Sequence, residues 1–157
     1  MDPKQLRHVM GHFATGVTII TTRDDAGRPY GLTANAFTSL SLDPPLVVIC
    51  VDRKTETFPH FLTSRCFVVN ILAEEQQELS SRFAKSGGDK FAGVPHTLNA
   101  AGVPVLEGAL AHIACTLTET HEGGDHVIHV GEVQDVVVRG GRPLLFFQGR
   151  YQKLPAD

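Results

Sequence analysis

Apolar and polar residues alternate between Tyr30 and Leu42, and this alternation is typical of a half-buried β-strand. One face of such a strand carries, apart from Thr38, apolar side chains: Tyr30, Leu32, Ala34, Ala36, Leu40 and Leu42. The other face carries small groups around one aromatic ring: Gly31, Thr33, Asn35, Phe37, Ser39 and Ser41. We predict that the first face packs into the core and that the second forms a flat wall of hydrogen-bonding groups.

The residues after this strand pass from a tight corner to an apolar run and then to charges. Asp43-Pro44-Pro45 predicts the corner, and the run 46–51 is apolar on both faces, as in a central strand. Arg53 and Lys54 follow Asp52 and precede a predicted helix start, where free backbone N–H groups and the helix dipole favour an anion. A polar wall that leads to an anion site suits a phosphorylated cofactor with a planar ring. A solvated strand face followed by surface cations has the same pattern.

The rest of the chain alternates between short helical patterns and strand patterns. Capping signals and helical spacing predict helices over 3–14, 58–62 and 73–83. Apolar strand patterns cover 17–22, 65–72, 109–119, 126–138 and 143–148, and 139–142 is predicted to be a hairpin turn. The segment 85–108 is rich in glycine and proline. We predict a long loop there, as a lid, a subunit contact or a plain surface excursion.

This order of elements predicts a mainly β protein with short helices, built as an antiparallel barrel with the helices at its periphery. The regular βα alternation of a parallel dinucleotide-binding sheet is absent, and so are the sequences G-x-G-x-x-G and G-x-x-x-x-G-K-[ST]. A length of 157 residues predicts one domain.

Composition and charge narrow the classes of partner. The net charge is −3 and the pI is about 6.2, so nothing draws the whole surface to nucleic acid or to an anionic membrane. No apolar run approaches the roughly 18 residues of a membrane span, and the first residues lack the features of a signal peptide. Cys50, Cys66 and Cys115 each lie in an apolar strand pattern, which predicts reduced, buried thiols in a cytoplasmic protein.

The sequence predicts neither a metal site nor a nucleophile. His112 and Cys115, like His126 and His129, are three residues apart, a spacing that sends the two side chains to opposite faces of a strand. No C-x-x-C, H-E-x-x-H or G-x-S-x-G sequence occurs. His126 stays a candidate because it follows a flexible turn at the mouth of a strand. A lone histidine at the start of a strand is more often incidental. Tyr151, at the end of the last strand, is a candidate cap for a ligand, and it can equally be an ordinary surface end.

Six segments in the same order resemble the flavin reductase-like family of FMN-binding split-barrel proteins. They are FATGVTIIT from Phe13, GLTANAFTSLSLDPPLV from Gly31, CVDR from Cys50, SRFA from Ser81, GDH from Gly124 and FQGRY from Phe147. The likeness is strongest to the small reductase components of two-component flavin monooxygenases. It implies a single flavin reductase-like domain over 1–157 with a six-stranded antiparallel split β-barrel. It also implies a cytoplasmic homodimer that passes reduced flavin to a separate oxygenase.

The resemblance further implies site residues for FMN or FAD and for NADH or NADPH. The isoalloxazine edge would be lined by Thr33, Ala34, Asn35 and Ala36, with Ser39 and Leu40 continuing the wall. Cys50, Val51 and Asp52 would approach the flavin through their backbone, and Arg53 and Lys54 would hold its phosphate. Phe83 would close the phosphate end, and His126, as the catalytic residue, would meet the nicotinamide together with Tyr151.

Three other functions fit the same barrel. One is an electron-transfer flavoprotein that keeps its FMN, another is a flavin-binding module without turnover, and the third is a haem-binding barrel. The sequence leaves the choice between FMN and FAD open, as it does the partner oxygenase. The lack of a basic cluster dedicated to a 2′-phosphate favours NADH over NADPH.

Overall fold

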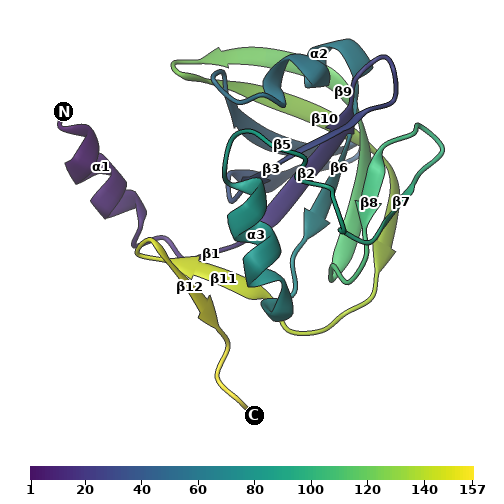
Figure 1. Ribbon diagram of the computed structural model, residues 1–157. Coiled ribbons are helices and arrows are strands. Elements are labelled where there is room, and N and C mark those ends of the chain that lie inside the picture. The colour runs from purple at the N-terminus through teal and green to yellow at the C-terminus, as the bar shows by residue number, and fades with distance from the viewer.

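A computed structural model describes residues 1–157, and its largest sheet is antiparallel and curls around a core (Figure 1). Its seven strands follow one another in the order β3 (Pro29–Ala34), β2 (Thr18–Arg23), β6 (Cys66–Ile71), β9 (Ala111–Gly123), β10 (His126–Val138), β5 (Pro45–Asp52) and β4 (Phe37–Leu42). The two edge strands, β3 and β4, are consecutive in the chain, and no hydrogen-bonded ladder joins them.

The six-stranded barrel that the resemblance implied is therefore wrong in its strand number, since this sheet has seven strands. Tyr30–Leu42, which we predicted as one strand, forms two of them, β3 and β4. The chain breaks at Asn35 and Ala36, where the amide of Cys50 donates to the carbonyl of Ala36 at 3.0 Å. A register shift between Ser39 and Ser41 then changes the phase of β4 against β5.

These two irregularities also reverse the predicted faces of β4. Phe37, which we placed on the polar wall, packs against the core. Leu40 and Leu42, which we placed in the core, are 53% and 95% exposed. A strand period predicts faces only while the strand is unbroken.

The main core lies inside the curled sheet, under helix α2 (Phe58–Ser64), which covers one of its ends (Figure 1). Phe61 of this helix is fully buried and meets Phe67 of β6 edge-on, with ring centroids 6.0 Å apart. A second cluster lies under the 3₁₀ turn η1 (Glu74–Gln76) and helix α3 (Gln77–Phe83), and consists of Val17, Ile19, Leu72, Phe83, Phe91, Leu106 and Leu144. The helix predicted over 73–83 is thus two shorter elements.

The segment predicted as a long loop contains a small hairpin of β7 (His96–Leu98) and β8 (Pro104–Leu106). Asn70, which is fully buried, holds it to the sheet by accepting from the amide of Leu106 at 2.9 Å and donating to the carbonyl of Ile19 at 2.9 Å. The part that has no regular structure is therefore limited to the residues between α3 and β7.

The C-terminal strands leave the main sheet. β11 (Leu144–Phe147) pairs with β12 (Arg150–Lys153) and with β1 (Thr15–Gly16), so the hairpin predicted at 139–142 is wrong. That segment instead carries the chain from one sheet to the other, with Gly140 and Gly141 at φ values of 78° and 128°.

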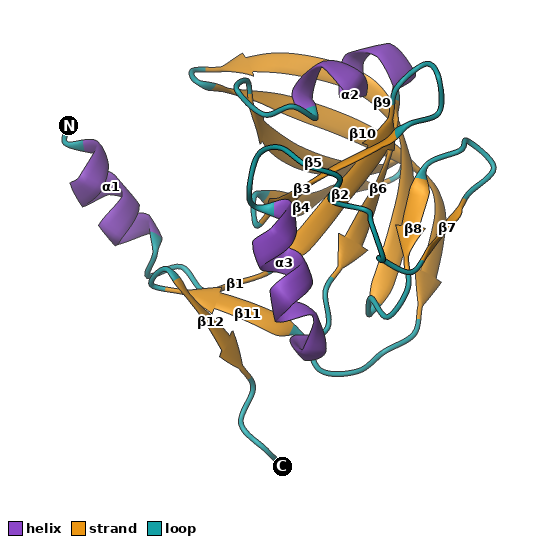
Figure 2. Cartoon of the chain, in the orientation of Figure 1, coloured by secondary structure: helices purple, strands orange, loops and turns teal.

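Helix α1 (Pro3–Met10) stands away from both sheets (Figure 2). The carboxylate of Asp2 caps it by accepting from the amide of Lys4 at 3.0 Å, and the helix ends four residues before the predicted Ala14. It buries no residue, and its apolar side chains are exposed. No helix of the structure is long and apolar enough to cross a membrane.

Candidate functional site

A cavity of about 190 Å³ lies between the end of β3, the end of β5 and the end of α3. Eight of the fourteen residues predicted for the site line it: Thr33, Ala34, Asn35, Ala36, Cys50, Asp52, Phe83 and His126. These residues come from four distant parts of the chain, and the pairing of His126 with Asp52 across β10 and β5 brings two of them together.

The side chains on the β3 wall of this cavity are small. The hydrogen bonds of Thr33 and Ala34 are made to neighbouring elements and not into the cavity. Thr33 donates its hydroxyl to the carbonyl of Ser80 in α3 at 2.6 Å, which fixes β3 against the helix. The hydroxyl of Thr18 donates to the carbonyl of Ala34 at 2.6 Å from the neighbouring strand. Asn35 is exposed at the break between β3 and β4 and lines the cavity.

His126 lies at the cavity rim with its orientation set by Asp125. The Nδ1 of His126 is 2.7 Å from Oδ1 of Asp125, and this hydrogen bond, together with the charge of His126, lowers the pKa of Asp125. A carboxylate is an acceptor only, so the proton stays on Nδ1 and Nε2 is left for a ligand.

The two cations predicted to bind phosphate do not line this cavity. The guanidinium of Arg53 is ion-paired with Glu122 of β9 and lies over the ring of Phe58, 6.0 Å from its centroid. Lys54 is exposed in the loop after β5. The helix that follows begins at Phe58, as predicted, four residues beyond Lys54.

The cations that do line the cavity are Lys85 and Lys90, which the sequence reasoning missed. The Nζ of Lys90 donates to the carbonyls of Gly31 and Phe83 at 3.4 and 3.3 Å. Burial lowers the pKa of Lys90, and the charge of Glu56 opposes this effect. Two lysines that flank the glycine pair at 87–88 after a helix were an available signal for an anion site.

The remaining predicted residues lie outside the cavity. Ser39 and Leu40 are exposed on β4, and the side chain of Val51 is buried in the core. The hydroxyl of Tyr151 is 2.7 Å from Oγ of the buried Ser80, and its ring packs on Phe146. Tyr151 therefore joins β12 to α3, on the far side of the contact between Thr33 and Ser80.

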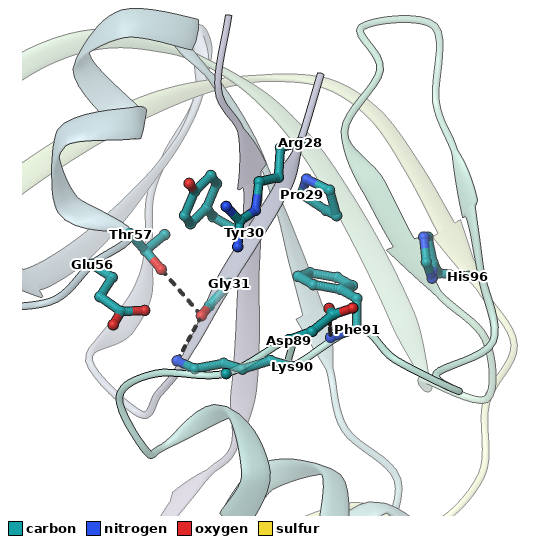
Figure 3. A pocket seen from close by; sticks show the side chains of 11 residues that line it. Arg28, Pro29, Tyr30, Gly31, Glu56, Thr57, Asp89, Lys90, Phe91 and His96 are labelled. Atoms are coloured by element: carbon teal, nitrogen blue, oxygen red, sulfur yellow. Dashed lines mark hydrogen bonds between the residues drawn. The ribbon is translucent and has the colours of Figure 1, made fainter. Parts of the chain in front are cut away.

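A second cavity of about 500 Å³ adjoins the first, and both are lined by Glu56 and Lys90 (Figure 3). Its other lining residues are Arg28, Pro29, Tyr30, Gly31, Thr57, Gly88, Asp89, Phe91 and His96. Lys90 and Thr57 both donate to the carbonyl of Gly31, at 3.4 and 3.1 Å, which ties the two sides of the groove to β3. The candidate site is thus a groove made of these two cavities, which share Glu56 and Lys90 as lining residues.

Residues 10–155 match the profile of the flavin reductase like domain. The chain belongs to the flavin reductase-like family.

Individual members of the family are similar to this chain in sequence and in structure. The reductase subunit HsaB of a flavin-dependent monooxygenase from Rhodococcus jostii (strain RHA1) is 46% identical over 158 residues, which cover 100% of this chain and 80% of the relative. Nitrilotriacetate monooxygenase component B from Mycobacterium thermoresistibile is 42% identical, with a TM-score of 0.93 over 97% of this chain and 86% of that one. The NADH:FAD oxidoreductase SgcE6 of Streptomyces globisporus, in complex with NAD and FAD fragments, is 38% identical, with a TM-score of 0.93 over 100% and 97%.

The groove of this flavin reductase-like chain fits a flavin nucleotide on its own residues. Small side chains at Thr33, Ala34 and Ala36 leave room for a planar ring, and Lys85 and Lys90 offer charge to a phosphate. His126 stands at the same rim with a free ring nitrogen.

Proposed function

We propose that this protein is an NAD(P)H:flavin reductase that reduces FMN or FAD and supplies the reduced flavin to a separate monooxygenase. The observation that carries the proposal is the groove itself, in which a flat wall of small residues, a rim histidine and two lysines meet. The relatives support it, because HsaB and component B are named as parts of monooxygenases and SgcE6 as an NADH:FAD oxidoreductase.

The chain's contribution to the reaction is to position two ligands. When bound, the flavin accepts the hydride that a reduced nicotinamide donates, and this chemistry belongs to the cofactors. The wall 33–36 would hold the flavin ring, and backbone groups at the break beside Asn35 would be available to its polar edge. His126 would offer Nε2 to the nicotinamide. Holding two flat groups in contact replaces a chance encounter, and no general base is required.

The same comparison supports a finer choice of substrates. The SgcE6 name supports FAD as the flavin and NADH as the donor. The free cysteines at positions 50, 66 and 115 support a reducing, cytoplasmic setting for the reaction.

We also propose a homodimer, supported by apolar surface that one chain leaves uncovered. Leu6, Val9, Met10 and Phe13 are 51–74% exposed on and after α1, although this helix has the spacing of an amphipathic one. Leu40 and Leu42 add apolar surface on β4. A second copy of the chain is an occupant of matching chemistry for these surfaces.

Anaerobic mixing of the protein with NADH and excess FAD tests the proposed reaction. We expect the flavin absorbance to bleach at a rate proportional to protein concentration. Bleaching no faster than without protein would refute the reductase and favour a flavin-binding module.

A further inference from the structure

Helix α1 and the turn between β11 and β12 enclose a basic cleft of about 470 Å³, lined by Lys4, Arg7, His8, Gly11, Gln148 and Gly149. It shares no lining residue with the two cavities of the candidate site. We propose that the basic cleft docks an acidic segment of a partner protein, the oxygenase that receives the reduced flavin. In naming the oxygenase, this inference rests on the proposed function.

The cations of α1 lie on one side of the helix. Lys4, Arg7 and His8 follow helical spacing, whereas the exposed apolar residues begin at Leu6, two positions and thus about 200° further round the helix. The first turn has no acidic residue, and the helix dipole disfavours a cation there. Lys4 is therefore not placed to stabilise the helix, and its position suits a role in binding.

Hydrogen bonds fix the two walls of the basic cleft against each other. The amide of Gln148 donates to the carbonyl of Gly11 at 2.8 Å, and its carboxamide nitrogen is 2.8 Å from Nε2 of His12. Nδ1 of His12 donates to the carbonyl of His8 at 2.9 Å, so Nε2 of the neutral ring accepts from Gln148. Gln148 has a left-handed φ of 51° in this contact. The end of α1 is therefore held beside the turn between β11 and β12 (Figure 1).

The chemistry of the basic cleft suits carboxylates. None of its six lining residues has an apolar side chain, so it offers little to a flat or apolar ligand. Lys4 and Arg7 are exposed, and no ion pair of the structure includes either of them. From Lys4 to Gly11 the helix face spans about 10 Å, the length of about three residues of an extended peptide. Exposed, unpaired charges favour fast and reversible association, which suits a partner that leaves once it has received flavin.

The hairpin that forms one wall of the basic cleft also contacts the helix beside the candidate site. Tyr151 of β12 follows the turn at Gln148, and its hydroxyl is 2.7 Å from Oγ of Ser80 in α3. The carbonyl of Ser80 accepts from the hydroxyl of Thr33, on the wall 33–36, at 2.6 Å. A partner in the basic cleft would therefore touch a hairpin that is hydrogen-bonded, through α3, to the proposed flavin wall. This connection favours the oxygenase over an unrelated acidic protein.

Fluorescence anisotropy with a labelled hexaglutamate peptide tests the docking surface in the absence of flavin and NADH. We expect saturable binding that weakens as the salt concentration rises from about 0.05 to about 0.3 M. The charge-reversed variant Lys4→Glu/Arg7→Glu should weaken binding about tenfold. The matched variant Arg139→Glu/Lys153→Glu reverses two exposed cations outside the basic cleft and should bind within about twofold of wild type.

No binding to the wild-type protein, or equal losses in the two variants, would overturn the inference. Displacement of the peptide by low millimolar inorganic phosphate would also overturn it, because it would show a site for small anions. A changed oligomeric state of Lys4→Glu/Arg7→Glu in size-exclusion chromatography would assign the basic cleft to a second copy of the chain, and a raised KM for FAD would assign it to the flavin site. Peptide binding by a protein that reduces no flavin would uphold the docking surface and contradict only the naming of the oxygenase.

Discussion

Nδ1 of His126 lies 2.7 Å from Oδ1 of Asp125, and the imidazole lines the cavity while the carboxylate faces solvent. Asp125 and His126 are adjacent at the turn between β9 and β10, and this turn places His126 at the groove. It sets which ring nitrogen is available to a ligand.

We therefore expect His126→Ala to raise the KM for NADH about five- to tenfold, because a hydrogen bond to the nicotinamide side is lost. Flavin affinity, measured by fluorescence titration, should not change. Asp125→Ala should have a smaller effect in the same direction, because it removes only the orientation of the ring. A variant at 126 that loses flavin affinity and keeps its KM for NADH would place His126 on the flavin side.

Phosphate binding should depend on Lys85 and Lys90 more than on Arg53 and Lys54. The double variant Lys85→Ala/Lys90→Ala should weaken FMN binding by about 1–3 kcal/mol, the range for charge-assisted hydrogen bonds. Riboflavin, which has no phosphate, should bind the wild-type protein and this double variant with the same affinity.

The matched double variant Arg53→Ala/Lys54→Ala should have less effect on FMN, because Arg53 is already paired with Glu122. Titration of FMN into the two double variants compares the two pairs of cations. A larger loss in the Arg53/Lys54 variant would show that the ion pair opens when flavin binds.

Gly131 should tolerate no side chain. A Cβ there would lie 2.5 Å from Cζ of Phe67 and 3.0 Å from Cβ of Cys115, both in the main core. Gly131→Ala should lower the free energy of unfolding by about 1–3 kcal/mol in urea titrations, as overpacked cores do. Gly16→Ala is the control, because nothing lies within 4 Å of its added Cβ. Equal stabilities of these two variants would contradict the close approach of Phe67 to Gly131.

His129 should make stability depend on pH. Its ring is fully buried between Phe58 and Phe61, Nε2 has no partner, and burial lowers its pKa from 6.5 to about 4. Between these two values the unfolded chain binds a proton that the folded chain does not. Stability should then fall as the pH falls through this window and should owe nothing to His129 above it.

From about pH 7.5 to pH 5 this effect amounts to at most about 2 kcal/mol. It can be measured by urea titration of wild type and His129→Phe, since phenylalanine cannot take up a proton. A wild-type protein with the same pH dependence as His129→Phe would disprove this assignment.

The sequence predicted the elements that rest on uninterrupted local patterns. The strand expected over 126–138 has the same bounds in the structure, and the stretch 33–36 lines the cavity. The errors occur where a tertiary contact, and not the local sequence pattern, determines the structure. The break at Asn35 and the register shift after Ser39 turn Leu40 outward, and neither leaves a mark in the alternation of residues.

Long-range partners explain why two other predicted site residues do not line the cavity. Arg53 is drawn to Glu122, which is 69 positions away in the printed sequence, and Tyr151 to Ser80. Lys90 reaches the groove because Asn70 and Thr21 hold the excursion after α3 against the sheet. Spacing along the chain carries no information about such contacts. The glycine pair at 87–88 between Lys85 and Lys90 was a local signal for cations at the groove, but it does not show where the segment packs.

The most direct test of the central claim is NADH oxidation by flavin-stripped protein, followed by the absorbance of the reduced nicotinamide, with and without added FAD or FMN. The account predicts no turnover without flavin and multiple turnovers whose rate rises with flavin and saturates. A rate that does not respond to added flavin would contradict it, because a released flavin must be a substrate of the reductase.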